Sequence, residues 1–468
     1  MRLSSRRTVR QGGELPKTVY YRSVWSCLLK LLLKGVTTMN LSEFINGISA
    51  GKFDEQFQML YGSADKAVLR ARARYLSAAE NFSRLYPESG EIRIFTASGR
   101  TEIGGNHTDH QHGCVLAAAV SLDIIAMVCF NGEGVIRVKS EGYDAVEVKL
   151  SDLKPKKKEK ETTAALIRGI AASFREKGVK IGGFDAYMTS DVLSGSGLSS
   201  SAAFEVLMGT VINAGFGNES IEAADIARIG QFAENTYFGK ASGLMDQLVS
   251  AVGGFVSVDF AEPENPDIRH IGFDFERSGY AVCITDTRGS HADCSDEYSA
   301  VTAEMKHVAE ALGCEFLREA DEDEFYAKLP ELRKVCNDRE LLRAAHFFDE
   351  NRRAAAEAEA LSDGDTEWFF ELVNESGTSS AELLQNLYIC TDPKDQQIPL
   401  AIMLSKRFLK GNGAVRVHGG GFAGTIQAFV PSYLTADYAA EMERVFGEGS
   451  CYVLSVRPVG GYELRIMS

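Results

Sequence analysis

Paired cysteines are absent from this sequence. Its nine cysteines are scattered, with neither CxxC pairs nor the His/Cys spacing of metal ligands. This pattern argues against a disulfide framework and against a zinc site recognisable from sequence. An odd number of scattered cysteines is typical of thiols in a reducing compartment, so we expect a cytoplasmic protein.

An excess of basic residues is also absent. Lys and Arg number 50 against 65 Asp and Glu, for a formal net charge of −15. Nucleic acids and membrane surfaces are polyanions that attract basic proteins, so we predict no partner of either kind. The longest basic cluster, residues 153–161, contains a proline and interleaved glutamates and is predicted to be a solvated loop.

Long hydrophobic runs are the third absence. No stretch reaches the length of a membrane helix. The 468 residues are 45% hydrophobic and 25% charged, which is typical of a soluble globular protein. This length suggests roughly two to four domains.

Residues 1–38 differ in composition from the rest of the chain. They carry eight Lys and Arg but a single acid, Glu14, and their apolar patch is interrupted by Lys30. A secretory signal would have an uninterrupted apolar run and a small-residue cleavage site, and neither is present. We therefore predict that residues 1–38 are a non-native or disordered extension and that the native chain begins at Met39.

The remainder mixes helical and strand patterns. Helices are predicted within residues 41–89, at 162–178, after 198 and through much of 296–410. Strands are predicted at 91–98, 114–130, 134–140, 145–150, 184–189, 255–260, 280–287, 414–418, 424–431, 451–456 and 462–467. Residues 114–130 are apolar enough to form a central strand or a pair of strands. Because the order shows no regular βαβ alternation, we predict an α+β fold in two lobes.

The sequence SGSGLSSSAA at residues 194–203 is the most informative motif. Gly195 and Gly197 permit positive φ and a close approach of ligand, and the following serines favour the start of a helix. Backbone N–H groups and the positive end of the helix dipole would then form an anion nest suited to phosphate. A plain turn is the alternative interpretation of so short a loop.

Two polar segments could complete a ligand site. Residues 99–113, GRTEIGGNHTDHQHG, place histidines and acids on a glycine-rich loop after a predicted strand. An irregular loop does not fix metal-ligand geometry, so hydrogen bonding to a polyhydroxylated ligand suits it better than a metal site. Residues 231–247, QFAENTYFGKASGLMDQ, place Glu234 in a predicted helix and Asp246 on a turn. Beside a phosphate site, such acids divide into a Mg²⁺ ligand and a group that orients or deprotonates a hydroxyl, and surface acids are the alternative.

Two later segments are punctuated by polar residues and glycine. Residues 285–298, TDTRGSHADCSDEY, form a polar loop where a predicted strand ends. Residues 418–425, HGGGFAGT, lie between two predicted strands. The glycines suit either a tight hairpin or a second wall of the phosphate site.

In this order and spacing, the motifs resemble those of the GHMP kinase superfamily and, within it, the galactokinases. The resemblance extends from about Met39 to the C-terminus. The family's GRVNLIGEHTDYNDG is similar to GRTEIGGNHTDHQHG, PxGSGLSSSAA to LSGSGLSSSAA, AExxFxGxxCGIMDQ to AENTYFGKASGLMDQ, NTxxxHxxxxxEY to DTRGSHADCSDEY, and GGGFGG to GGGFAG.

The resemblance implies a two-lobed GHMP kinase fold, with an N-terminal domain at 39–275, a C-terminal domain at 276–468 and the active site between them. It implies small-molecule partners, ATP with Mg²⁺ and a hexose that is phosphorylated at its anomeric hydroxyl, first of all D-galactose. A kinase for another hexose or a modified galactose is one alternative. A catalytically silent, galactokinase-like sugar sensor is another.

The resemblance also implies roles for individual residues. Asp246 would lie next to the anomeric hydroxyl, and Arg100 would stabilise the developing alkoxide. Ser201 and Glu234 would hold Mg²⁺. Phosphate contacts would come from Gly195, Ser196, Gly197, Leu198, Ser199, Ser200 and Ser201, and sugar contacts from Asn106, His107, Asp109, Gly243 and Tyr298.

Several positions depart from the family pattern. Asn106 replaces a glutamate that is a sugar ligand in galactokinases, Glu102 replaces an asparagine, and Gly104 replaces an isoleucine. An amide donates as well as accepts, and a site that hydrogen-bonds each hydroxyl discriminates strongly, so these changes could alter sugar choice. Ser201, Glu234 and the Arg100/Asp246 pair are all retained, which favours an enzyme over a sensor.

Two other nucleotide-binding classes fit less well. The segment GSGLSS begins like the GxGxxG of a dinucleotide-binding protein, but it lies far from the start of any regular βαβ series. The GxxxxGK[ST] pattern of P-loop kinases is absent.

Overall fold

The computed structural model describes residues 38–192, 198–240, 242–289 and 294–466. The prediction for residues 1–38 therefore lies, apart from Thr38, outside the described residues, and so do the predicted phosphate contacts Gly195, Ser196 and Gly197. Met39 is 2% exposed and pairs with Ile92 through backbone hydrogen bonds.

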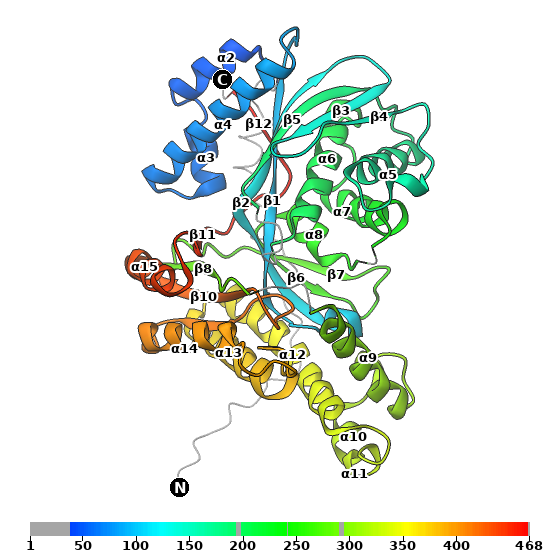
Figure 1. The fold of residues 1–468 in the computed structure, drawn as a ribbon, viewed down its shortest axis with the longest axis vertical. Helices are drawn as coiled ribbons and strands as arrows, with labels where there is room; N and C mark the ends of the chain where they lie inside the picture. Colours follow the sequence, from blue (N-terminus) through cyan, green and yellow to red (C-terminus); the bar gives the residue numbers. More distant parts are fainter. Residues whose placement is uncertain (1–37, 193–197, 241, 290–293, 467–468) are drawn as a thin grey trace.

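A large sheet forms the centre of the upper lobe (Figure 1). Its strand order is β12-β1-β2-β5-β3-β4, and β6 pairs with β2 and β7. The strands are β1 (Arg93–Gly104), β2 (Cys114–Phe130), β3 (Val135–Ser140), β4 (Val146–Lys149), β5 (Phe184–Ser190), β6 (Phe255–Asp259), β7 (Asp267–Ile271) and β12 (Tyr462–Leu464). The sequence patterns did not predict β7, whose residues are mostly polar or exposed.

The segment left open as one strand or two is a single long strand, β2. Its first part pairs with β6 and its second part with β5, so the sheet divides along this strand. Ile124, Ala126 and Val128 belong to one core cluster, and Ile125 and Met127 belong to another. Because successive side chains point to opposite faces and both faces are covered, the strand is apolar apart from Ser121 and Asp123.

Helices cover both faces of the large sheet (Figure 1). One layer contains α2 (Leu41–Ser49), α3 (Asp54–Tyr61) and α4 (Asp65–Leu85), and the other contains α5 (Thr163–Glu176), α6 (Ser200–Phe216), α7 (Ala223–Phe232) and α8 (Met245–Val252). A π-helical segment, Ala233–Phe238, continues α7. Asn40 starts α2 with a reciprocal capping box to Glu43, which satisfies backbone donors at the helix start.

The lower lobe is built on a four-stranded sheet of order β11-β8-β10-β9. Its strands are β8 (Tyr280–Asp286), β9 (Ala414–Val417), β10 (Thr425–Pro431) and β11 (Cys451–Leu454). The helices are α9 (Ser295–Leu312), α10 (Glu322–Ala327), α11 (Leu329–Leu332), α12 (Asp338–Asp363), α13 (Thr366–Ser379), α14 (Gln397–Leu409) and α15 (Thr435–Phe446). One sheet face packs on α14 and α15, and the other packs on α12 and α13.

The two sheets separate near the predicted boundary at residue 275, with one exception. Strand β12, close to the C-terminus, returns to the upper lobe and pairs with β1. The basic segment at residues 153–161 is a mostly exposed connection with one 3₁₀ turn at Lys157–Glu159, as predicted.

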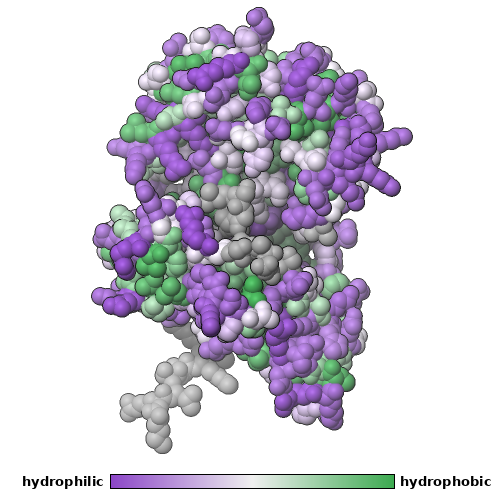
Figure 2. Space-filling model, viewed as in Figure 1, coloured by the Kyte–Doolittle hydropathy of each residue, from purple (hydrophilic) through white to green (hydrophobic). Residues whose placement is uncertain are grey.

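Most of the surface in Figure 2 is hydrophilic, with a hydrophobic area on the lobe that holds α14 and α15. Leu400 and Met403 of α14 and Val445 of α15 are among the exposed large hydrophobic residues. No helix among the described residues has the length and apolar character needed to cross a membrane.

Candidate active site

Arg100 and Asp246 meet where strand β1 passes the start of helix α6. The pairing of β1 with β2 shifts register between Ser98 and Arg100, where β2 carries the extra residues between Ala119 and Asp123, and such irregularities often redirect a side chain beside an active site. A side chain at Gly99 would crowd the Leu198 carbonyl, to which the Arg100 N–H donates at 3.2 Å. The Arg100 Nε then donates to Asp246 Oδ1 at 2.8 Å.

The positions of these two residues correct the sequence prediction. Strand β1 continues to Gly104, so Arg100 lies on a strand and not on the predicted loop. Asp246 lies in the first turn of α8 and not on a turn outside a helix. Both functional groups are therefore held on regular elements, which is the more rigid arrangement.

Ser199 contributes a second contact to Asp246. Its hydroxyl donates to Asp246 Oδ2, and its backbone adopts a left-handed conformation with φ 53° just before α6. Such a conformation is costly for a residue other than glycine and is commonly found at functional sites. The contact ties the end of the phosphate-loop motif to the candidate catalytic aspartate.

Asp246 is held as a carboxylate. Burial alone would raise its pKa, but the charge of Arg100 and the hydrogen bonds from Arg100 and Ser199 outweigh burial and lower the pKa below its ordinary value. The Asp246 side chain is 32% exposed, whereas Arg100 is 11% exposed. An ionised, partly accessible oxygen pair beside a buried cation can accept a hydrogen bond from a ligand hydroxyl.

Glu234 lies on the π-helical segment behind this pair. Its side chain is 3% exposed, Lys240 Nζ lies 3.1 Å from its Oε1, and Gln247 Nε2 donates to its Oε2 at 2.9 Å. The same Gln247 nitrogen donates to Glu205 Oε2 at 3.0 Å. Burial and then the charge of Glu234 raise the pKa of Glu205 to about 9, so Glu205 is neutral at pH 7.

A second group of predicted residues lies around Gly243 and the glycine-rich segment at residues 419–421. The Asp109 carboxylate is near Gly243, where an added Cβ would lie 3.6 Å from Asp109 Oδ2. The rings of His107 and Tyr298 stack with centroids 6.5 Å apart. His107 Nε2 contacts the Gly420 carbonyl at 3.0 Å, and the Tyr298 hydroxyl donates to the Gly421 carbonyl at 2.9 Å. The glycine-rich hairpin between β9 and β10 therefore forms one wall of this site.

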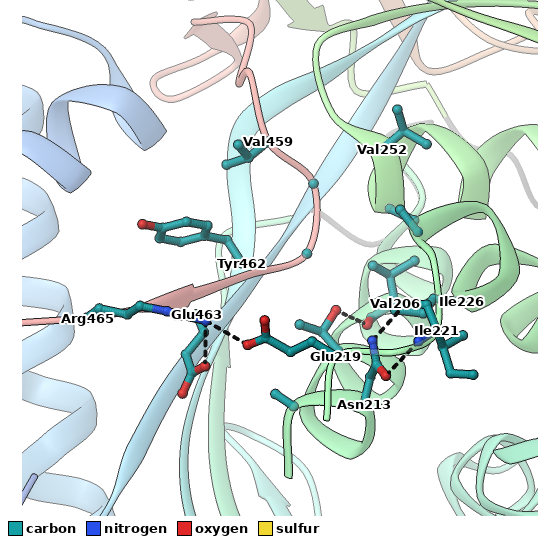
Figure 3. Close-up of a pocket in the computed structure, with 16 residues that line it drawn as sticks. Val206, Asn213, Glu219, Ile221, Ile226, Val252, Val459, Tyr462, Glu463 and Arg465 are labelled. Carbon is teal, nitrogen blue, oxygen red and sulfur yellow. Dashed lines mark hydrogen bonds and ion pairs between the residues drawn. The ribbon is translucent and has the colours of Figure 1, made fainter. Parts of the chain in front are cut away.

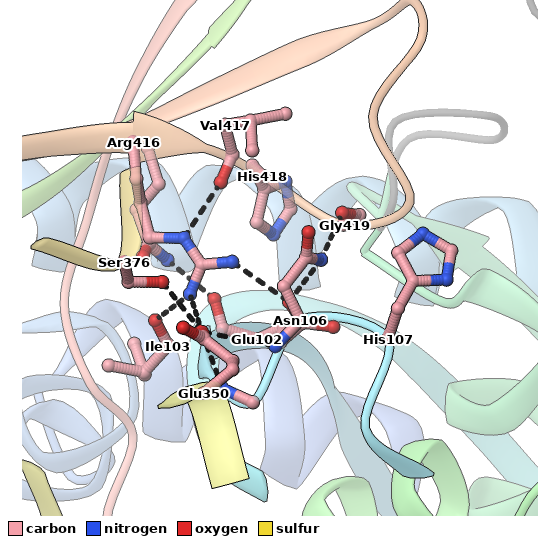
Figure 4. A network of polar contacts seen from close by, with 12 residues as sticks. Glu102, Ile103, Asn106, His107, Glu350, Ser376, Arg416, Val417, His418 and Gly419 are labelled. Carbon is pink, nitrogen blue, oxygen red and sulfur yellow. Dashed lines mark hydrogen bonds and ion pairs between the residues drawn. The ribbon is translucent and has the colours of Figure 1, made fainter. Parts of the chain in front are cut away.

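Asn106 was predicted to be a sugar ligand, but its side chain is hydrogen-bonded to other residues of the protein (Figure 4). Its side chain is buried, and its Nδ2 donates to Glu102 Oε1 at 2.9 Å and to the Gly419 carbonyl at 2.7 Å. Its Oδ1 accepts from Asn386 Nδ2 at 2.8 Å. Since both N–H groups already have acceptors, a sugar hydroxyl could accept from this amide only if one of these bonds broke.

Glu350 holds the backbone of the same loop from below (Figure 4). Its Oε1 accepts from the N–H groups of Gly105 and Asn106 at 3.2 and 3.3 Å and from the Ser376 hydroxyl at 2.6 Å. Burial would raise the pKa of Glu350, but nearby positive charge, first that of Arg416, holds it at about 2. This loop therefore rests on a permanently charged buried carboxylate.

His346 completes the support as a neutral ring. Its Nε2 lies 3.0 Å from the Asn106 carbonyl, which can only accept, so Nε2 carries the proton. Its Nδ1 then accepts from the Ser379 hydroxyl at 2.8 Å. Burial lowers the pKa of His346 to about 4, which agrees with this assignment.

Glu357 occupies the space beside Gly104. A Cβ at residue 104 would overlap the Glu357 carboxylate, which is fully buried and lacks a hydrogen-bond partner among the described residues. Burial and then the charge of Glu350 raise the pKa of Glu357 well above its ordinary value, so this acid is neutral. The glycine in place of the family's isoleucine thus leaves room for the Glu357 carboxylate of α12.

The structure brings most of the predicted residues together. Arg100, Leu198, Ser199 and Asp246 form one connected group. Asn106, His107 and Tyr298 form a second group around the glycine-rich hairpin, and Asp109 lies near Gly243. Ser200 and Ser201 are half-buried in the first turn of α6. Sequence reasoning missed Gln247, although it adjoins Asp246, and missed Asn386 and Glu350, whose positions in the sequence carry no signal for this contact.

A separate cavity of about 320 Å³ lies between α6, α7, α8 and the segment leading to β12 (Figure 3). Val206 and Ile226 line its apolar side, and the ion pair of Glu219 with Arg465, 2.6 Å apart, closes its polar side. None of the described residues that line it is a predicted site residue.

Comparisons with known proteins place these observations in a family. The family described as GHMP kinases N terminal domain matches residues 165–254, and the galactokinase galactose-binding signature matches residues 80–129. A galactokinase of Streptomyces coelicolor is 30% identical over 351 residues, which is 75% of this chain and 87% of the relative. A galactokinase of Glaesserella parasuis is 31% identical over 353 residues, with coverage of 75% and 88%.

Solved structures agree on the fold. Lactococcus lactis galactokinase complexed with galactose superposes with a TM-score of 0.69 at 23% identity, covering 83% of this chain and 99% of that one. A mevalonate kinase superposes with a TM-score of 0.54 at 14% identity, covering 77% and 98%. The predicted GHMP kinase fold is therefore confirmed, and the chain belongs to the galactokinase family of the GHMP kinases.

Proposed function

We propose that this sugar kinase transfers the terminal phosphoryl group of ATP to the anomeric hydroxyl of a hexose, with D-galactose as the expected substrate. The observation that carries the proposal is the Arg100–Asp246 pair, which is joined to Ser199 at the start of α6 and lies on the same segment as Gly243, the neighbour of Asp109. In this proposal the phosphates bind at this helix start and the sugar hydroxyl binds at the Asp246 carboxylate.

In this proposal Asp246 accepts a hydrogen bond from the attacking hydroxyl and orients its oxygen. The lowered pKa makes Asp246 a weak base, but phosphoryl transfer passes through a loose transition state that needs positioning more than early proton removal. The Arg100 guanidinium stabilises the negative charge that develops on the sugar oxygen. The proton leaves the hydroxyl late, to the Asp246 carboxylate.

The start of α6 suits the nucleotide phosphates. Ser199, Ser200 and Ser201 precede or begin a 17-residue helix, whose unpaired N–H groups and dipole favour anions. We assign Leu198 to the same group through its backbone. Gly195, Ser196 and Gly197, which lie outside the described residues, remain part of the proposed phosphate loop.

The family implies Mg²⁺, and the residues present fit it. Glu234 and Ser201 offer a carboxylate and a hydroxyl, which are oxygen ligands of the kind Mg²⁺ prefers. The buried Glu234 charge is already balanced by a cation, Lys240, whose side chain is 60% exposed and can be displaced without opening the core. When bound, Mg²⁺ would neutralise charge on the ATP phosphates.

For the sugar side we propose direct contacts from His107, Asp109, Gly243 and Tyr298. Asn106, expected from the family pattern to be a sugar ligand, is better suited to holding Gly419 in place, because its amide hydrogens are committed to Glu102 and that carbonyl. The hexose preference would then depend on the shape of the glycine-rich wall as well as on the contacting groups.

A coupled ADP-release assay over a panel of hexoses, with the phosphorylated carbon located by NMR, tests the proposal. We expect galactose 1-phosphate, and a fall in kcat of about 100- to 10,000-fold in Asp246→Asn. Asp267→Asn, a change at an exposed acid of β7, is the matched control. Absence of a phosphorylated product from every hexose would contradict the function, and a full rate in Asp246→Asn would remove Asp246 from the chemistry.

We also propose a cytoplasmic location and retain two lobes divided near residue 275 as the domain organisation, with β12 added to the first. The described cysteines form no disulfide with one another, which supports a reducing compartment.

A further inference from the structure

Three side chains of metal-ligand type meet outside the candidate active site, where helix α9 packs against the start of α12. They are His307 of α9, Cys336 just before α12 and Glu340 in the first turn of α12. One ligand atom from each lies within 4.8 Å of the other two. The sequence offered no signal for this group, because the histidine is remote in the chain from the other two residues.

Glu340 is held in place before any ligand arrives. Asn337 caps α12, its N–H donates to Glu340 Oε2 at 2.7 Å, and the Glu340 N–H donates back to Asn337 Oδ1 at 3.0 Å. This reciprocal box fixes the carboxylate and leaves Oε1 directed at His307 Nδ1, 3.1 Å away. Cys336 immediately precedes the cap residue, so the same turn places its thiol beside the carboxylate.

The two helices that carry the ligands are also fixed relative to each other. Glu304 lies one turn before His307 on α9, and its carboxylate accepts from Arg339 Nε at 3.0 Å and from Arg343 Nη1 at 2.8 Å. Arg343 is 1% exposed and Glu304 is 12% exposed, so solvent screens this contact poorly. A ligand set on such a support loses little conformational entropy when it binds a metal.

We propose that His307, Cys336 and Glu340 bind a Zn²⁺ ion, with solvent as the fourth ligand. Imidazole and thiolate are the ligands that zinc takes most often, and a carboxylate oxygen is the third common type. A thiolate and a carboxylate together balance the two positive charges of the ion. Cys336 is buried and Glu340 nearly so, whereas the His307 side chain is 47% exposed, so the open position faces water.

The distances are compatible with a tetrahedral ion. Two ligands at about 2.0 Å from zinc lie about 3.3 Å apart, close to the 3.1 Å between His307 Nδ1 and Glu340 Oε1. The separation of the Cys336 thiol from the His307 ring nitrogen, at most 4.8 Å, shortens if the half-exposed His307 side chain rotates, and the Cys336 thiol already lies within 4.8 Å of a Glu340 oxygen. Burial and then the Glu340 charge raise the pKa of the Cys336 thiol, so the metal must displace its proton to solvent.

A hydrogen bond between His307 and Glu340 would by itself explain why those two residues meet. The thiol distinguishes the two interpretations, since only a metal site needs Cys336. Titration of the reduced full-length protein with Co²⁺, a spectroscopic substitute for zinc, separates them. We expect a thiolate-to-cobalt charge-transfer band with one equivalent of Co²⁺, and loss of the band when Zn²⁺ is added.

The variants make the test specific. Cys336→Ser should abolish the charge-transfer band, and His307→Ala, a change at an exposed side chain, should weaken Co²⁺ binding by about 10- to 100-fold or more. Cys390→Ser removes an exposed cysteine and should leave the band unchanged. Cobalt at the oxygen ligands of the candidate active site would give no thiolate band, so the result does not depend on the proposed kinase function. Absence of the band in the wild type, or its survival in Cys336→Ser, would overturn the proposal.

Discussion

Replacing Asn106 with aspartate tests whether this side chain holds the glycine-rich wall of the sugar site. The change is nearly isosteric and keeps the oxygen that accepts from Asn386. It removes both amide hydrogens, and with them the bonds to Glu102 and to the Gly419 carbonyl. A second carboxylate oxygen would instead face the Glu102 carboxylate within hydrogen-bonding distance.

The expected cost follows from these contacts. Losing a bond to a charged acceptor costs about 1.5–3 kcal/mol, and losing one to a neutral carbonyl costs about 0.5–1.5 kcal/mol. Repulsion between the two carboxylates adds to this, and Arg416, 3.3 Å from Glu102 Oε1, offsets part of the repulsion. We expect Asn106→Asp to lower the free energy of unfolding by about 3–5 kcal/mol at neutral pH.

The pH dependence gives a second signature. Repulsion and burial would raise the pKa of the new carboxyl in the folded state. The folded variant is therefore most stable at low pH, where this carboxyl is protonated, and it loses that stability as the pH rises through the raised pKa. Denaturant unfolding at several pH values should therefore show the deficit shrinking toward acidic pH. The exposed Asn412→Asp serves as control.

The kinetic effect of Asn106→Asp should be confined to the hexose substrate. Gly420 and Gly421 contact His107 and Tyr298, so a displaced wall should lower kcat/KM for the hexose by about 10- to 100-fold and leave the KM for ATP unchanged. A variant as stable as the wild type, with an unaltered hexose KM, would refute the reasoning that Asn106 positions this wall.

Three further predictions rest on the same network and its neighbours. Asn106→Glu alone should lower the free energy of unfolding. The double variant Glu102→Asn/Asn106→Glu, which restores the family's order of the two residues, should show a coupling free energy of at least about 1 kcal/mol in a double-mutant cycle. Additive effects would show that the pair is uncoupled. Ser199→Ala should lower kcat by about tenfold and move the acid limb of the pH–rate profile upward, because the pKa of Asp246 loses one lowering hydrogen bond; an unchanged profile would remove that contact from catalysis. Above pH 4.5, the free energy of unfolding of Glu357→Gln should rise relative to that of the wild type by up to about 1.4 kcal/mol per pH unit, because the wild-type acid stays protonated only in the folded state. An unfolding free energy with the same pH dependence in both proteins would contradict the raised pKa of Glu357.

Sequence patterns predicted the layers of the fold because local chemistry decides them. The predominantly apolar sequence of β2 favours a strand covered on both faces, and the structure covers it with helices on both sides. The order of the motifs predicted the fold and the family, and the comparisons confirm both. Element boundaries were less accurate: Arg100 belongs to a strand and Asp246 to a helix, since pairing with β2 and packing of α8 extend both elements beyond what glycine-rich sequence favours.

The sequence by itself determined which chemical groups are available: the phosphate-loop serines, the acids and the arginine of the candidate site. Only the tertiary structure decided what each group faces. Asn106 was expected to face the sugar, yet its bonds to Gly419 and Asn386 cross some 300 residues of chain, which no spacing rule can foresee. The neutral Glu357 beside Gly104, and the meeting of His307 with Cys336, have the same origin. Burial and long-range contact set the charge and the partners of a side chain, and both exist only after the chain has folded.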